Sequence, residues 1–360
     1  MMLSYALGVC AIAAAALACK PPKAPPTKET VERVALVGGI RFVSEEEGFE
    51  LTDGISLLDH ETDTYNSSNL RLPEALVYAS AIGYNGQLIV TGGSGVDGRQ
   101  RRRAAATIGD TLFLCARQRG GRSHVHDCHS YSMAEDKWTT LKAEIPESRG
   151  IKDVSVYSMV AVDDRYLYLV FYEVRKRKTL ETRRDSFFSA PQRRRKSRER
   201  RALVARQHFF VVYRLDTHDV GADWTLLSET PDDNMNIRLS SAVLTADGKG
   251  ILACGFGIVE TPGRKDEATK CAIYSLETNT WATGPTMPAQ QPSEVRYDTR
   301  LIRCDGRVFG FRTRADEEGR AKVAVAVLGD GAHDWQALQQ LSSNNGFDEF
   351  SVACMQMRMK

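Results

Sequence analysis

A dense group of arginines is the first feature of the sequence that could do chemistry. Residues 175–206 contain fourteen Lys or Arg and three acidic residues, a formal charge of +11. The whole chain carries +2, so the remainder is acidic, at about −9. The cluster is densest at Arg193, Arg194, Arg195, Lys196, Arg198, Arg200 and Arg201. Such a cluster can attract a polyanion by counterion release, for example a sulfated glycan outside the cell or a nucleic acid inside it.

Two other interpretations of this segment are open. A loop of this composition can be disordered and solvated, with no specific ligand. Arg198-Glu199-Arg200-Arg201, followed by Ala202, resembles the cleavage site of furin-like proprotein convertases, and exposed loops are where proteases act. The segment is therefore a candidate for binding or for processing.

Histidines form a second cluster. His124, His126 and His129 flank Asp127 and Cys128. Strand alternation places His124 and His126 on one face, and neutral imidazoles at this spacing can bind zinc or copper. No further ligand can be assigned, so we predict no metal site and no cofactor. We also find no Ser-His-Asp signature, phosphate-binding glycine loop or zinc-spaced cysteine pairs, and therefore predict no catalytic residue.

The N-terminal segment predicts export. Residues 6–19 are an uninterrupted run of small and apolar residues that includes Ala16-Leu17-Ala18, which is typical of a signal peptide and short for a membrane span. We expect a signal peptide at 1–18, a Pro/Lys-rich tether at 19–32, and a secreted or secretory-pathway protein. The alternative is a bacterial lipoprotein anchored at Cys19. Asn66 opens a glycosylation sequon in a predicted turn, which fits export.

The arginine and histidine clusters lie in a chain of short, repeated strand patterns. Glu61 to Tyr65 reappears as Glu277 to Trp281, and Ala134 to Trp138 has the same shape. Tyr131 and Tyr274 each lie seven residues before the Trp, and further copies end at Trp224 and Trp335. Tight hairpin turns recur as well, at Asn85-Gly86, Gly109-Asp110, Asp163-Asp164, Asp247-Gly248 and Asp305-Gly306.

These features together resemble the kelch repeat: a strand ending in a Gly pair (Gly38-Gly39, Gly92-Gly93), a strand with Tyr, a turn and a Trp. The resemblance spans roughly residues 33–358 and implies an all-β, kelch-type β-propeller with four-stranded antiparallel blades. Five aromatic repeats are visible and residues 94–124 have room for another, so we expect six blades within a range of five to seven. The predicted propeller covers 33–360, with the basic loop 175–206 inserted in it. The family's closure implies that Glu349 to Met357 pairs with Val34 to Gly39.

Four cysteines occupy equivalent places in two repeats. Cys115 and Cys254 each end a second strand, and Cys128 and Cys271 each stand three residues before the Tyr of the third strand. Neighbouring strands lie about 4.8 Å apart, a spacing that suits a disulfide. We predict bridges Cys115–Cys128 and Cys254–Cys271, with Cys304–Cys354 as a further candidate across the closure. Bridges favour an oxidising compartment.

The predicted function is interaction with a partner. Loops on a rigid scaffold are where recognition concentrates, and the basic loop connects the second and third strands of one blade. We expect an exported monomer without a stable membrane span that binds a protein or an acidic glycan, and we do not expect a nucleic acid as partner. The alternative is a secreted or periplasmic propeller enzyme, since kelch-type propellers include galactose oxidase and sialic acid mutarotase, whose active-site residues find no match here.

Overall fold

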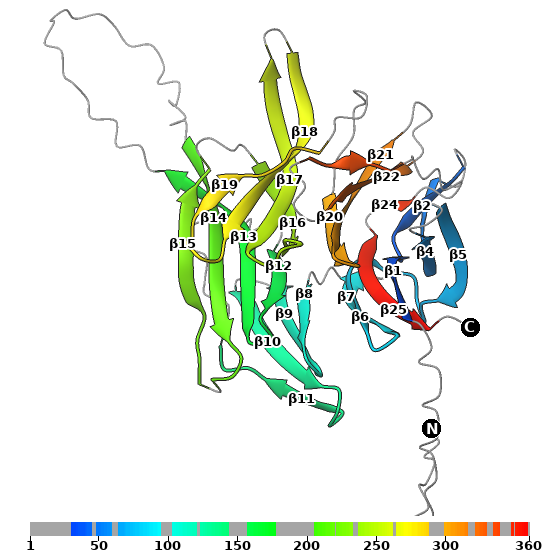
Figure 1. Ribbon diagram of the computed structural model, residues 1–360, viewed down its shortest axis with the longest axis horizontal. Coiled ribbons are helices and arrows are strands. Elements are labelled where there is room, and N and C mark those ends of the chain that lie inside the picture. Colours follow the sequence, from blue (N-terminus) through cyan, green and yellow to red (C-terminus); the bar gives the residue numbers. More distant parts are fainter. Residues whose placement is uncertain are drawn as a thin grey trace, which may run out of the picture.

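The computed structural model describes residues 30–44, 48–59, 64–94, 103–120, 123–143, 157–177, 205–219, 221–232, 237–261, 264–287, 299–315, 321–329, 334–338, 347–348 and 350–358. Antiparallel strands form the regular structure of these residues (Figure 1). Five sheets have four strands each, one has three and one has two. The four-stranded sheets are the blades of a β-propeller.

Four blades are built from consecutive strands, and each is named here after its aromatic residue. The Trp138 blade consists of β8 (Arg103–Ile108), β9 (Thr111–Gly120), β10 (Ser123–Ser132) and β11 (Lys137–Thr140). The Trp224 blade consists of β12 (Tyr157–Val162), β13 (Tyr166–Arg177), β14 (Ala205–Asp216) and β15 (Thr225–Pro231). The Trp281 blade consists of β16 (Ile237–Leu244), β17 (Gly250–Thr261), β18 (Arg264–Ser275) and β19 (Trp281–Thr283). The Trp335 blade consists of β20 (Thr299–Cys304), β21 (Arg307–Ala315), β22 (Ala321–Leu328) and β23 (Gln336–Ala337).

The fifth blade combines both ends of the described chain, as expected from the sequence. This closure blade has the order β25 (Ser351–Arg358), β1 (Thr30–Val37), β4 (Gly54–Asp59) and β5 (Thr64–Arg71). β1 and β25 pair from Thr30↔Arg358 to Val37↔Ser351. The strand begins at Thr30, so the boundary that we expected at residue 33 falls inside it. A small sheet of β2 (Ile40–Ser44), β3 (Gly48–Leu51) and β24 (Phe347–Asp348) accompanies this blade.

The expectation of six four-stranded blades is wrong for the described residues, which form five. Residues 103–120 supply β8 and β9 of the Trp138 blade instead of a hidden blade. The remaining hairpin, β6 (Val77–Tyr84) with β7 (Gln87–Ser94), is a two-stranded sheet. It takes a place in the ring, because the first strands β25, β6, β8, β12, β16 and β20 contact one another in that order.

The repeated aromatic residues open the outer strands. Tyr131 lies opposite Trp138, and Tyr274 lies opposite Trp281, with ring centroids 4.8 and 5.3 Å apart. The turn between these strands contains Asp136 or Asn279 at positive φ, and each side chain accepts a hydrogen bond from the Tyr hydroxyl. The seven-residue spacing is therefore a cross-strand pair closed by a polar turn.

Apolar clusters hold neighbouring blades together. One joins the Trp138 and Trp224 blades around Phe113, Leu169 and Trp224, and others follow at the next interfaces around the ring. The hairpin β6–β7 packs on the closure blade through Ala81, Leu88 and Val90. Burial of this kind contributes about 25 cal/mol per Å² and makes the ring a rigid support for its loops.

Candidate interaction face

The connections between second and third strands define one end of the propeller, which we call the hairpin face. Antiparallel order puts these connections at the end of each blade opposite the tight first turns. The hairpins β9–β10, β13–β14, β17–β18 and β21–β22 reach this face. In Figure 1 the β17–β18 hairpin projects upward, whereas the turn between β10 and β11 lies at the bottom.

The basic segment starts from one of the two longest of these hairpins. β13 and β14 pair from Tyr166↔Asp216 to Arg177↔Ala205, so the segment connects the second and third strands, as the sequence predicted. Residues 178–204 lie outside the described part of the chain. The seven clustered cations are among them: Arg193, Arg194, Arg195, Lys196, Arg198, Arg200 and Arg201.

Two hairpins pair positions occupied by cations. Lys176 is the register partner of Arg206 in the β13–β14 ladder, and Arg314 is that of Lys322 in the β21–β22 ladder. The β17–β18 ladder instead pairs Glu260 with Lys265.

Arg175 has a structural role at the start of the segment. Its Nη1 lies 2.5 Å from Glu229 Oε1 and its Nη2 lies 2.8 Å from Glu173 Oε2. Its guanidinium also stacks on the Phe209 ring, 4.3 Å from the centroid. The hydrogen bonds that Arg175 donates to Glu229 and Glu173 raise its pKa above its usual value. Because Glu173 is only 1% exposed, this cation neutralises a buried carboxylate.

A second side-chain pair, between Tyr172 and His208, was not predicted from the sequence. Tyr172 Oη and His208 Nδ1 are hydrogen bonded, and their rings lie 5.2 Å apart. The signal was the departure from the repeat, because Phe171-Tyr172 stands where two repeats have a glycine pair.

The three histidines are not brought together by their strand. His124 and His126 lie opposite Arg119 and Arg117 in β10, whereas His129 falls on the other face by alternation. Its Nδ1 is 3.3 Å from Thr140 Oγ1. Among the described side chains, no group of three metal-ligating residues lies on the hairpin face.

Three disulfides join the six cysteines that the sequence analysis paired. Cys115–Cys128 and Cys254–Cys271 each link the second and third strands of one blade, with Cα atoms 4.1 Å apart. These strands extend to Gly120 and Thr261, so the cysteines lie inside the strands and not at their ends. Cys304–Cys354 links β20 to β25 across two blades, with Cα atoms 5.3 Å apart.

Asn66 lies in strand β5, opposite Leu57, and our placement of it in a turn is wrong. The polar run that suggested a turn belongs to the outermost strand of the closure blade, where polar residues can face water.

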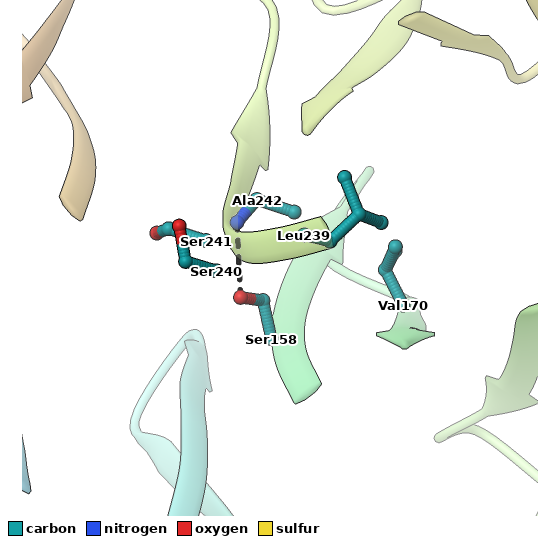
Figure 2. A pocket seen from close by; sticks show the side chains of 6 residues that line it. All are labelled: Ser158, Val170, Leu239, Ser240, Ser241 and Ala242. Carbon is teal, nitrogen blue, oxygen red and sulfur yellow. Dashed lines mark hydrogen bonds between the residues drawn. The ribbon is translucent and has the colours of Figure 1, made fainter. Parts of the chain in front are cut away.

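The described residues contain no helix long and apolar enough to span a membrane. One small hollow lies between β12 and β16 (Figure 2), lined by Ser158, Val170, Leu239, Ser240, Ser241 and Ala242. It has essentially no volume that a water molecule could occupy, whereas ligand pockets usually have about 300 Å³ or more. Ser158 Oγ accepts a hydrogen bond from Ala242 N at 2.9 Å, and Ser241 Oγ accepts one from Leu301 N at 3.1 Å. These hydroxyls therefore join adjacent first strands.

Comparisons with known proteins found distant similarities among solved structures. No protein-family profile matches the chain, and no curated protein matches its sequence, so the kelch assignment stays a prediction. A protein of unknown function from Dyadobacter fermentans is 12% identical with a TM-score of 0.41, over 74% of this chain and 69% of its own.

Two further structures are similar. The Trypanosoma rangeli sialidase, solved with sialic acid, is 13% identical with a TM-score of 0.39, over 72% of this chain and 40% of its own. YjhT is 10% identical with a TM-score of 0.36, over 85% of this chain and 81% of its own. Likenesses this distant carry no argument about activity.

Proposed function

We propose that this protein is an exported interaction module that binds an acidic partner on its hairpin face. The observation that carries the proposal is the extended β13–β14 hairpin, from whose end the basic insert begins. A sulfated glycan is the class of partner that we would test first, because its charge density favours binding by counterion release.

The scaffold supports this proposal. Blades packed through apolar clusters and cross-linked by three disulfides hold the hairpins in fixed relative positions. Disulfides are typical of proteins that fold in an oxidising compartment, which fits the signal peptide that we predict at 1–18. Lys176 and Arg206 are paired positions near the end of the described β13–β14 ladder, close in sequence to the insert.

Chromatography on immobilised heparin tests the proposal. The wild-type protein should be retained and should elute as salt is raised, and R193Q/R194Q/R195Q should elute at lower salt because fewer counterions are released. The matched control K249Q/R303Q/R307Q removes the same charge at the opposite end of the blades, near the turns at Gly248 and Gly306, and should elute nearly as the wild type does. An equal shift in both variants, or no retention of the wild type, would contradict the proposal.

A further inference from the structure

Glu32, Cys304 and Cys354 form a cluster that the interaction face does not use. They come from β1, β20 and β25, and their carboxylate and sulfur atoms all lie within 4.8 Å of one another. Cys304 is buried, whereas Cys354 and Glu32 are partly exposed. The cluster therefore joins two blades at a place that solvent can reach.

The carboxylate of Glu32 is held beside the sulfurs. Its Oε2 accepts a hydrogen bond of 2.7 Å from the backbone N–H of Asp305 and lies 3.5 Å from Cys354 Sγ. Its Oε1 accepts one of 3.4 Å from Gln356 Nε2. These contacts hold the carboxylate beside the disulfide, from the turn after β20 and from β25.

We propose that opening the Cys304–Cys354 bond turns this cluster into a zinc site. A dithiol reductant donates two electrons and two protons, becomes a disulfide itself and leaves Cys304 and Cys354 as thiols. Zn²⁺ then displaces two protons, binds the two thiolates and takes Glu32 as its third ligand. A water molecule completes the tetrahedron.

The chemistry of the three ligands favours zinc. Thiolate and carboxylate are both zinc ligands, and three protein ligands with one open position form an exchangeable site. The Cα atoms of the two cysteines are 5.3 Å apart, and the sulfurs need only separate enough to share a metal. Zinc bound there would replace the covalent link between β20 and β25, so the two blades would stay joined.

The other two disulfides lack this arrangement. Cys115, Cys128, Cys254 and Cys271 are at most 1% exposed, and each pair lies within one blade. Among the described residues, no third metal-ligating side chain accompanies either pair. They are therefore less accessible to a reductant and serve as internal controls.

Metal binding by the full-length protein tests the proposal. After mild treatment with a dithiol, alkylation and peptide mapping should show Cys304 and Cys354 as the free thiols. Titration with Zn²⁺, or with Co²⁺ as a coloured probe, should then give one bound ion per chain, and the oxidised protein should bind none. C304S/C354S should bind none after the same treatment, whereas C115S/C128S should still bind one.

Glu32→Gln keeps every cysteine, so it tests the site even if the cysteine variants fail to fold. It should form the disulfide normally and, once reduced, bind Zn²⁺ at least about tenfold more weakly, since loss of a supporting group typically costs 10–100-fold in affinity. The proposal is overturned if reduced protein with both thiols free binds no zinc, if C304S/C354S still binds it, or if E32Q binds it as tightly as the wild type.

Discussion

The charge of Arg175 is used inside the fold. Its guanidinium contacts the carboxylates of Glu173 and Glu229, and Glu173 is buried. Sequence alone could not show this role, because only packing tells whether a cation of the basic segment contacts a carboxylate. The sequence identified the segment but not this ion pair.

Replacing Arg175 with Gln should therefore destabilise the protein. Removing one partner of a buried pair leaves an uncompensated charge, and we expect the free energy of unfolding to fall by about 3 kcal/mol. Arg165→Gln is the matched control, because the Arg165–Asp216 pair is much more exposed and should contribute about 1 kcal/mol or less. Urea unfolding at neutral pH measures both. Equal losses in the two variants would mean that Arg175 does not neutralise Glu173.

Ionisation of the Tyr274 hydroxyl should lower the stability of the fold at alkaline pH. It is fully buried, its hydroxyl donates to Asn279 Oδ1 at 2.8 Å, and burial raises its pKa to about 12 from an ordinary value of 10.0. A raised folded pKa means that the stabilisation is fully present below pH 10 and is lost as the pH rises through 12, up to about 2 kcal/mol. Tyr274→Phe should lose about 1 kcal/mol at neutral pH but show a shallower decline between pH 10 and 12 in urea unfolding. The same decline in both proteins would assign the alkaline sensitivity elsewhere.

At the scale of elements, local patterns predicted strands better than they predicted the number of blades. The spacing between Tyr131 and Trp138 reflects a direct cross-strand pair, and the turns at Asn85-Gly86, Asp163-Asp164 and Asp305-Gly306 all have positive φ at both positions. Such features depend on neighbouring residues alone, so they can be inferred from one copy of the repeat. The five aromatic residues correspond to the five four-stranded blades.

The sixth position in the ring depends on contacts between distant segments, which the sequence does not reveal. β6 packs so closely on β25 that a Cβ atom on Gly83 would lie 1.8 Å from the Cys354 carbonyl oxygen. In the sequence, Gly83 inside a strand is the local sign of this close contact. The hairpin β6–β7 has a blade-like turn at Asn85-Gly86 but no described outer strands, whereas the sequence had placed the sixth blade in residues 94–124.

At the scale of the whole molecule, two strand ladders join segments that are far apart in the sequence. β1 pairs with β25, and β13 pairs with β14 across the basic insert. The disulfides are distributed differently: Cys115–Cys128 lies before residue 201, and Cys254–Cys271 and Cys304–Cys354 both lie after it. A cut in the insert would therefore produce two fragments that are joined by sheets and packing but by none of these covalent bonds.

Because the ladders span residue 201 and the disulfides do not, cleavage after Arg201 tests both the ring closure and the disulfide pairing. A furin-type convertase should yield fragments 1–201 and 202–360, or a shorter first fragment where the leader has been removed. The two should co-elute on native size exclusion, because the β13–β14 and β1–β25 ladders both span the cut. In denaturant they should separate without any reductant, since the three disulfides lie within fragments. R198A/R201A should stay intact under the same treatment. Fragments that part under native conditions would show that these ladders do not hold the ring closed, and fragments that part only after reduction would contradict the disulfide pairing.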